Sequence, residues 1–349
     1  MSSSPLAAVE EPAPETAPVL ASRFLTRRTL LSIGSAIIIV AIAIWRAPIN
    51  WGDAWTRISH ADPKLYALGL AAYYASFLVR GYRWKLLLAN AGEERPTRPL
   101  TLILVTSFFV NCVVPAKMGD VYRAYLGRLR QHISGTKALG TIIAERLMDL
   151  VVLMGLLLIA GAYTFHRRAP GALVPYVIAG LTVSSLGIAV ILVMRAGRGQ
   201  RILRLMPEAI FHRYQGFRIG AVESLKRLPL LLSLTVLVWG LEAARLGFVV
   251  GALGFTREVG PSQFLLIALV AALLTTVPFL PGGIGLVEAG MVGVLTLVAG
   301  ISNNDALSIA LLDRSISYGS LVLLGFVVFA ITHLHVSPHP ARHPGEQTG

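Results

Sequence analysis

Arginine, aspartate and glutamate residues lie inside or at the edges of the most apolar stretches of this sequence. They are Glu145, Arg146, Asp149, Glu242, Arg245, Asp313 and Arg314. A charge at the centre of a membrane-spanning helix costs about 2.5–3.5 kcal/mol on insertion scales. We therefore expect these side chains to face the protein interior or water, where they can bind a ligand, carry protons or pair with one another.

The spacing of these charges leaves two interpretations open. The charges at 146 and 149, and those at 242 and 245, are spaced at i, i+3 and can pair on one helix face. Asp313 and Arg314 are adjacent and point apart, so each needs a partner elsewhere. One interpretation is a structural ion-pair network that holds the protein together. The other is a direct role in handling a ligand or protons.

Two stretches rich in proline and glycine, residues 111–120 and 275–288, interrupt the apolar pattern. Apolar runs beside them, at 100–110, 264–274 and 286–299, are shorter than the roughly 20 residues of a spanning helix. Proline and glycine do not continue a helix well. Since irregular backbone at membrane depth must lie within protein or against water, we expect two re-entrant helical hairpins. Short helices joined by ordinary surface loops are the alternative.

Three matched landmarks predict an internal duplication of the chain. The matched landmarks are Arg80 and Arg245, Pro115 and Pro281, and Arg146 and Arg314, which are 165, 166 and 168 residues apart. Repeat one covers about residues 65–165 and repeat two about residues 229–333. Together they form most of an expected transmembrane domain at 23–335, between disordered cytoplasmic tails at 1–22 and 336–349.

The composition is that of a membrane protein with several spans. Of 349 residues, 55% are hydrophobic and 14% charged, and the mean hydropathy is +0.68, which excludes a soluble globular protein. The formal net charge of +13 indicates cytoplasmic loops rather than nucleic-acid binding. The single cysteine, Cys112, excludes an intramolecular disulfide, and the eight histidines lie away from the span centres. No metal or other cofactor is expected.

Basic loops set the expected orientation. The spans are predicted at 30–44, 65–88, 138–165, 173–194, 230–253 and 307–331, with both termini in the cytoplasm. Arg80, Arg83 and Lys85 end the second span on the cytoplasmic side, and residues 195–227 form the most basic loop. The first hairpin then enters from the cytoplasm and the second from outside. The predicted fold is an all-α polytopic membrane protein with about six full spans, two re-entrant hairpins and a transporter-like inverted repeat.

The hairpin tips predict an anion site. Broken helices expose backbone N–H groups, and helix N-termini favour anions. The helix that begins near Gly285 presents such an N-terminus, and Lys117 and Arg123 add positive charge beside the first tip. The phosphate of an anionic lipid or of a polyprenyl phosphate fits this chemistry, and the spacing does not choose between them.

These motifs together resemble the flippase-like transmembrane region of the lysylphosphatidylglycerol synthase family. The resemblance covers about residues 25–335 and rests on four segments: an expected turn at 80–84 (RGYRW), residues 111–123, residues 145–149 and residues 281–288. It implies a membrane domain that moves aminoacylated phosphatidylglycerol from the inner to the outer leaflet. In full-length members of that family a soluble aminoacyl-transferase domain follows, so we expect a stand-alone member without it.

The expected function is translocation of a phospholipid, or of another lipid-linked anionic headgroup, in the bacterial inner (plasma) membrane, without enzymatic activity. The alternatives are a scaffold that recruits a lipid-synthesis enzyme through residues 195–227 and, with less support, a lipid-modifying membrane enzyme. The expected partners are membrane lipids; a homo-oligomer and a lipid-synthesis enzyme are compatible with the sequence. The expected substrate-binding residues are Arg80, Asn111, Pro115, Lys117, Asp120, Arg123, Glu145, Arg146, Asp149, Arg245, Pro281, Gly282, Gly283, Gly285, Glu288, Asp313 and Arg314.

Single-cysteine labelling tests the expected topology. In a Cys112→Ala background, cysteines at Arg98 and Arg130 should react with an impermeant reagent only from the cytoplasm, because they flank the first hairpin. Cysteines at Arg257 and Asn303 should react only from outside. Labelling at position 130 from outside would contradict both the first hairpin and the inverted repeat.

Overall fold

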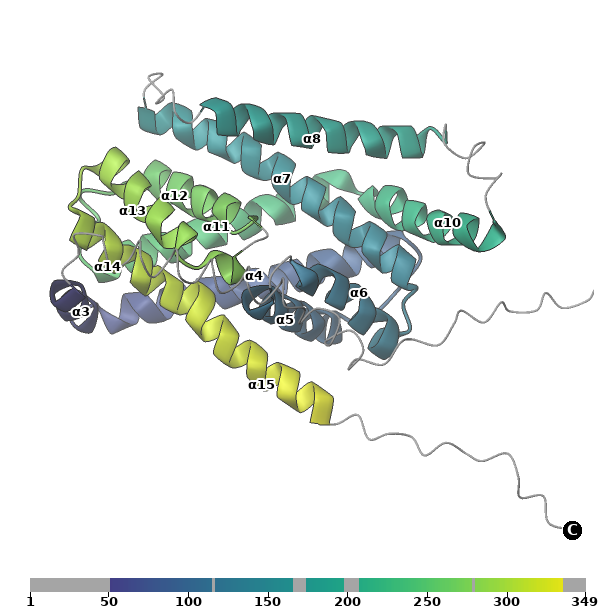
Figure 1. Ribbon diagram of the computed structural model, residues 1–349, viewed down its shortest axis with the longest axis horizontal. Coiled ribbons are helices and arrows are strands. Elements are labelled where there is room, and N and C mark those ends of the chain that lie inside the picture. The colour runs from purple at the N-terminus through teal and green to yellow at the C-terminus, as the bar shows by residue number, and fades with distance from the viewer. Residues whose placement is uncertain (1–50, 115–116, 166–173, 198–206, 278–279, 335–349) are drawn as a thin grey trace, which may run out of the picture. The chain divides into compact units, whose positions relative to one another are not determined.

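The computed structural model describes residues 51–114, 117–165, 174–197, 207–277 and 280–334, and every regular element within them is a helix (Figure 1). The expected all-α class is confirmed. The expected first span at 30–44, both expected tails and Pro115 lie outside the described residues. Among those residues, the segments long and apolar enough to cross a membrane are Val177–Arg195, Leu228–Ala252, Pro281–Ala299 and Asn303–Ile331.

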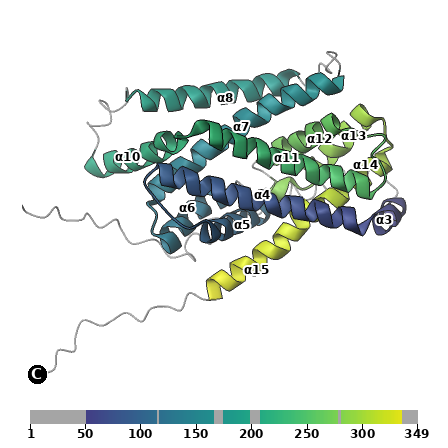
Figure 2. The same cartoon turned by 180° about the vertical axis from the view of Figure 1, so that it is seen from behind.

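Helix α4 (Pro63–Asn90) contributes to both halves of the fold and follows the short helix α3 (Trp51–Ser59). It begins where the Asp62 carboxylate accepts a hydrogen bond of 2.7 Å from the backbone N–H of Lys64. It packs along α11 (Leu228–Ala252), as Figure 2 shows. Its apolar residues enter two buried clusters. One cluster also contains residues of α11, α12 (Pro261–Leu274) and α14 (Asn303–Arg314), and the other contains residues of α5 (Thr97–Val113), α6 (Met118–Gln131) and α7 (Gly135–Phe165).

The segment 80–84 is part of α4, so the prediction of a turn there is wrong. Glycine at position 81 does not interrupt the helix because its neighbours on both sides are held by tertiary contacts. Arg80 and Arg83 bond carboxylates on other helices, and Trp84 is fully buried. Tertiary packing here overrides the weak local preference.

The first stretch with proline and glycine separates α5 (Thr97–Val113) from α6 (Met118–Gln131). Lys117, the residue before α6, has left-handed backbone (φ 55°) and no capping hydrogen bond from its side chain. The N–H of Gly119 donates instead to Oδ1 of Asn111, at 2.8 Å. Helix α6 packs back on α5, so this stretch is a helix–break–helix unit.

The second stretch has the same plan. Helix α12 (Pro261–Leu274) is followed by a 3₁₀ turn, η3 (Pro281–Gly283), and by α13 (Leu286–Ala299), which packs on α12. The Glu288 side chain reaches back so that its Oε2 accepts a hydrogen bond of 2.6 Å from the N–H of Gly285. This is half of a capping box. The N-terminus that was expected to attract an external anion therefore holds the protein's own carboxylate.

Helices α7 (Gly135–Phe165) and α8 (Val174–Arg195) lie side by side in both views. Side chains of α8 such as Ile178 and Leu186 are 58% and 65% exposed although they are apolar. Such a surface suits contact with hydrocarbon. The most basic loop contains α10 (Glu208–Val222) and the short turn η2 (Glu223–Leu225), and α10 packs along α7.

The last described helix has a widened turn at its middle. Helix α14 (Asn303–Arg314) passes through the π-helical segment η4 (Ser315–Ser320) into α15 (Leu321–Leu334). Tyrosines of α4 bond the widened turn: Tyr73 donates to the carbonyl of Ser317 at 2.8 Å, and the hydroxyl of Tyr74 lies 2.8 Å from that of Ser320. Segments of this kind are frequent at functional sites.

Replacing Gly140 tests how closely α7 and α10 pack. A Cβ atom at Gly140 would lie 2.3 Å from the carbonyl oxygen of Phe217, so Gly140→Ala should destabilise the protein by about 1–3 kcal/mol. The thermal midpoint of the purified protein in detergent should fall. Gly155→Ala, on the same helix, is the control because no atom lies within 4 Å of its added Cβ and alanine favours helix. Equal midpoints for the two variants would contradict the packing.

Candidate functional site

A cavity of about 360 Å³ lies between the two halves, bordered by residues of α4, α5, α6, α7, α11, α12, η3, α13 and the continuous α14–η4–α15 helix. Arg146 and Arg314, the matched arginines, both line it as predicted. The expected residues that line it are Arg80, Asn111, Lys117, Asp120, Arg146, Asp149, Arg245, Gly282, Asp313 and Arg314. Those that do not are Arg123, Glu145, Pro281, Gly283, Gly285 and Glu288. The structure thus gathers side chains from both predicted repeats around one space.

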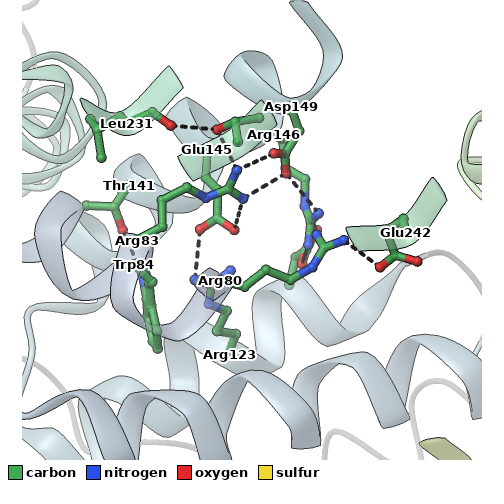
Figure 3. A network of polar contacts seen from close by, with 12 residues as sticks. Arg80, Arg83, Trp84, Arg123, Thr141, Glu145, Arg146, Asp149, Leu231 and Glu242 are labelled. Carbon is green, nitrogen blue, oxygen red and sulfur yellow. Dashed lines mark hydrogen bonds and ion pairs between the residues drawn. The ribbon is translucent and has the colours of Figure 1, made fainter. Parts of the chain in front are cut away.

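A buried ion-pair cluster supports one wall of this cavity (Figure 3). The guanidinium of Arg83 donates to Glu145 Oε1 at 2.9 Å and to Asp149 Oδ1 at 2.6 Å. It also donates to the hydroxyl of Thr235 on α11, at 2.7 Å. Arg123 donates to the other oxygen of Glu145 at 2.8 Å and stacks over Trp84, with its guanidinium carbon 3.9 Å from the ring centroid.

The placement of Arg83 corrects the sequence analysis, which assigned it to a basic span end facing the cytoplasm. Its side chain is 0% exposed. Glu145 and Asp149 are four residues apart on α7, so they present two carboxylates on one face to the same guanidinium. Their attraction offsets the loss of hydration that would otherwise keep Arg83 at the surface.

A second chain of ion pairs runs along the cavity lining from α4 through α11 to α14. Arg80 donates to Glu242 Oε1 at 3.0 Å, and Glu242 Oε2 accepts from Arg245 at 3.3 Å. Arg245 continues the chain by bonding the carboxylate of Asp313. The i, i+3 pair of Glu242 with Arg245 is confirmed, and so is the need of Asp313 for a distant partner.

The two repeats also contain matched arginine–carboxylate pairs. Arg146 donates to both oxygens of Asp120, at 2.9 and 2.7 Å, and Arg314 donates to Glu288 at 2.9 Å. In each pair the arginine follows its carboxylate by 26 residues, and each carboxylate is the third residue of the helix after a break. The predicted pair of Arg146 with Asp149 exists at 3.7 Å, but Asp120 is the closer partner.

The two breaks meet at Tyr318 and Arg314. Arg314 donates to the carbonyl of Gly282 at 2.7 Å, and the hydroxyl of Tyr318 donates to the carbonyl of Cys112 at 3.4 Å. Gly282 has positive φ, and a Cβ there would lie 2.4 Å from the Tyr318 ring. Glycine is therefore needed for this close approach.

Several lining residues were not among the expected set. Tyr73, Phe108, Trp239 and Glu242 line the cavity. Arg80 and Arg146 both lie near the ring of Phe108, at 5.4 and 5.6 Å from its centroid. Glu242 was recognised in the sequence as a charge within an apolar stretch. That signal could have placed it among the expected substrate-binding residues, although it was left out of them. The aromatic residues carry no comparable signal within apolar helices.

Removing Arg83 tests how far the buried cluster stabilises the fold. Arg83→Met should destabilise the protein by about 3–5 kcal/mol because Glu145 and Asp149 remain buried with fewer partners. Adding Asp149→Asn should restore part of the loss. Arg57→Met is the control: it breaks a pair with Asp305 whose arginine is 49% exposed, which should cost about 0–1 kcal/mol. Equal shifts in the denaturation midpoint for Arg83→Met and Arg57→Met would contradict the structural role.

Comparison of the sequence with those of known proteins identifies the family of this chain. Residues 32–325 match the family described as the lysylphosphatidylglycerol synthase transmembrane region. A UPF0104 membrane protein of Methanocaldococcus jannaschii is 32% identical over 235 residues, which are 66% of this chain and 97% of that protein. A UPF0104 membrane protein of Methanothermobacter thermautotrophicus is 27% identical over an alignment of 316 positions, which covers 84% of this chain and 90% of that protein.

A further relative is longer than this chain. Glycosyltransferase AglD of Haloferax volcanii is 26% identical over an alignment of 354 positions, which covers 90% of this chain but only 56% of that protein. These relatives are archaeal. The match over most of the sequence shows that this chain belongs to the family of the lysylphosphatidylglycerol synthase transmembrane region, as a multi-pass membrane protein.

Proposed function

We propose that this protein moves a lipid with an anionic headgroup between the leaflets of a plasma membrane. The headgroup passes through the cavity between the two helix–break–helix units while the acyl or prenyl chains stay in the bilayer. In this proposal six helices cross the membrane, both termini are cytoplasmic, and α5–α6 and α12–α13 are hairpins that enter from opposite sides. Pro281–Ala299 is then a hairpin arm rather than a crossing.

The observation that supports this proposal most directly is the shared cavity lined by matched arginines of both repeats. Transporters built from inverted repeats bind their substrate where broken helices meet at the repeat interface. Here the breaks approach each other through Tyr318 and Arg314, which contact Cys112 and Gly282. A site between two such units can open to either side by moving one against the other.

The charges of the cavity suit a phosphate group. Its lining includes the cations Arg80, Lys117, Arg146, Arg245 and Arg314, which outnumber by one the carboxylates Asp120, Asp149, Glu242 and Asp313 in the same lining. The planar fork of arginine matches phosphate oxygens with two parallel hydrogen bonds. A headgroup that leaves water for hydrocarbon loses its hydration at great cost, and these cations replace that hydration. The exposed apolar surfaces of α8 and α15 are available to the surrounding lipid.

Lipid movement in proteoliposomes tests the function. The full-length protein is reconstituted into vesicles containing phosphatidylglycerol with a fluorescent acyl chain, and an impermeant reductant bleaches the label in the outer leaflet. A protein-dependent loss of the inner-leaflet signal supports translocation. If the lipid stays in place in well-sealed vesicles with folded protein, the translocase proposal fails and the scaffold alternative gains support.

The two matched arginines should each be needed for movement. Arg146→Lys and Arg314→Lys keep the charge but lose the planar fork, so each should slow translocation about tenfold, equivalent to about 1.4 kcal/mol. Folding, followed by thermal unfolding, should change little. Arg57→Lys, in an exposed ion pair outside the cavity, is the matched control and should transport normally.

A double variant separates phosphate binding from structure. Asp120 is the bidentate partner of Arg146, so Arg146→Gln with Asp120→Asn removes the ion pair without leaving either charge buried alone. If this variant folds and transports as well as the wild type, Arg146 has a structural role only. Folding without transport supports contact with the substrate.

A further inference from the structure

We propose that the contact between α4 and the widened turn η4 is a gate of the cavity, which opens to water while the ion-pair cluster around Arg83 stays closed. This inference rests on the proposed function and concerns the regulation of the same site. The contact is made by tyrosines of α4 and serines of η4, which together we call the hydroxyl seam: Tyr66 with Ser315, Tyr73 with Ser317 and Tyr74 with Ser320.

The hydroxyl seam lies between the cavity and the surface. Tyr73 and Ser317 line the cavity, and Tyr73 is only 5% exposed. Ser315, in the same seam, is exposed. Elsewhere in the lining, the side chain of Arg146 is 34% exposed and Thr276 is exposed as well. The cavity thus reaches the surface near Arg146 and is closed at the seam, which is the arrangement of an alternating-access transporter with one side open and the other shut.

Opening the seam leaves its serines with hydrogen-bond partners. Each serine hydroxyl donates to a carbonyl oxygen three or four residues earlier in its own helix, at 2.7, 3.1 and 2.6 Å for Ser315, Ser317 and Ser320. These bonds stay when α4 moves away, so water has to bind chiefly the tyrosine hydroxyls and the carbonyl of Ser317. Parting Arg83 from its carboxylates would instead leave buried charges without partners, which costs more than losing neutral hydrogen bonds. The seam is therefore the contact that opens more easily.

The corresponding contact between α7 and α11 has a different composition. With the offset of 165 residues that relates Arg80 to Arg245, the three tyrosines correspond to Leu231, Val238 and Trp239. With the offset of 168 residues that relates Arg146 to Arg314, the three serines correspond to Leu147, Asp149 and Val152, in a helix without a widened turn. All of these but Asp149 are apolar or aromatic, and Asp149 is bound by the buried Arg83. Water can replace the partners in the hydroxyl seam, whereas it gains little from entering an apolar contact closed by an ion pair.

A disulfide across the seam holds it closed. A Cβ atom at Gly69 on α4 would lie 3.2 Å from Cδ1 of Ile316 on η4. Gly69→Cys with Ile316→Cys, in a Cys112→Ala background, removes that atom and brings two thiols within reach of a bond. The matched control joins α10 to α7 outside the cavity lining: it is Gly216→Cys with Thr136→Cys, because a Cβ at Gly216 would lie 3.3 Å from that of Thr136.

Amide hydrogen exchange in lipid nanodiscs tests the opening without requiring transport. Residues 315–321 exchange only when water reaches them, so oxidising the seam pair should slow their exchange about tenfold relative to the reduced form. Oxidising the control pair should leave this exchange unchanged. Tyr73→Phe loses one hydrogen bond and should speed it about fivefold, whereas Tyr163→Phe, at a position 73% exposed on α7, should not. The inference is overturned if oxidation of the seam pair changes nothing, or if Tyr73→Phe exchanges as the wild type does.

Lipid movement then shows whether the opening serves the proposed function. The full-length variants are reconstituted with the labelled phosphatidylglycerol, and albumin extracts the outer-leaflet label so that no reductant acts on the disulfide. Translocation should stop in the oxidised seam pair, return after reduction and continue in the oxidised control pair. Full movement with the seam oxidised overturns the gate. A seam that opens by hydrogen exchange, in a wild type that moves no lipid, supports the motion and defeats the translocase function instead.

Discussion

The buried guanidinium of Arg83 is the interaction on which the arrangement of the central helices depends. An arginine with no exposed surface persists only where carboxylates neutralise it and accept its N–H groups. Glu145 and Asp149 do this from α7, and Thr235 adds an acceptor from α11. Since Arg83 lies on α4, one side chain joins three helices at a point. Arg123 brings α6 to the same cluster through the second oxygen of Glu145. The cavity wall built on these helices therefore has little freedom to shift while the pairs are intact.

The two helix breaks are stabilised in the same way, by an ion pair between a carboxylate and a later arginine. They differ in the side chain that accepts a hydrogen bond from the backbone after the break. After each break, the third residue of the new helix is a carboxylate that binds an arginine from a later helix. In repeat one the amide of Asn111 binds the backbone N–H of Gly119, whereas in repeat two Glu288 itself binds the N–H of Gly285. In repeat two the carboxylate of Glu288 therefore binds both the backbone N–H of Gly285 and the guanidinium of Arg314. The backbone N–H groups of Gly119 and Gly285, which would be unfavourable without a partner among apolar helices, are thus bound by side chains of the protein.

Much of the site could be predicted from the sequence because charges within apolar stretches are conspicuous. The i, i+3 pair of Glu242 with Arg245, the distant partners of Asp313 and Arg314, and the shared cavity of Arg146 and Arg314 all followed from local spacing or from the repeat. Arg83 could not be placed in this way. Near a span end a basic residue suits the positive-inside rule, and its carboxylate partners lie 62 and 66 residues later. Trp239 and Tyr73 were missed for another reason: an aromatic residue in an apolar helix looks the same whether it faces lipid, core or cavity.

The widened turn at Ser315–Ser320 changes the rotational phase of the last described helix. A π turn accommodates one residue more than an α-helical turn would, and one residue corresponds to about 100° of rotation about the helix axis. The side chains of α15 are therefore rotated about the helix axis relative to the positions that they would have if α14 continued as a regular α-helix. Before the turn, Leu307, Ile309 and Ala310 are buried and Arg314 faces the cavity; after it, Leu323 and Phe326 are 72% and 59% exposed. One continuous helix thus serves as an inner wall along its first half and as an outward-facing apolar surface along its second.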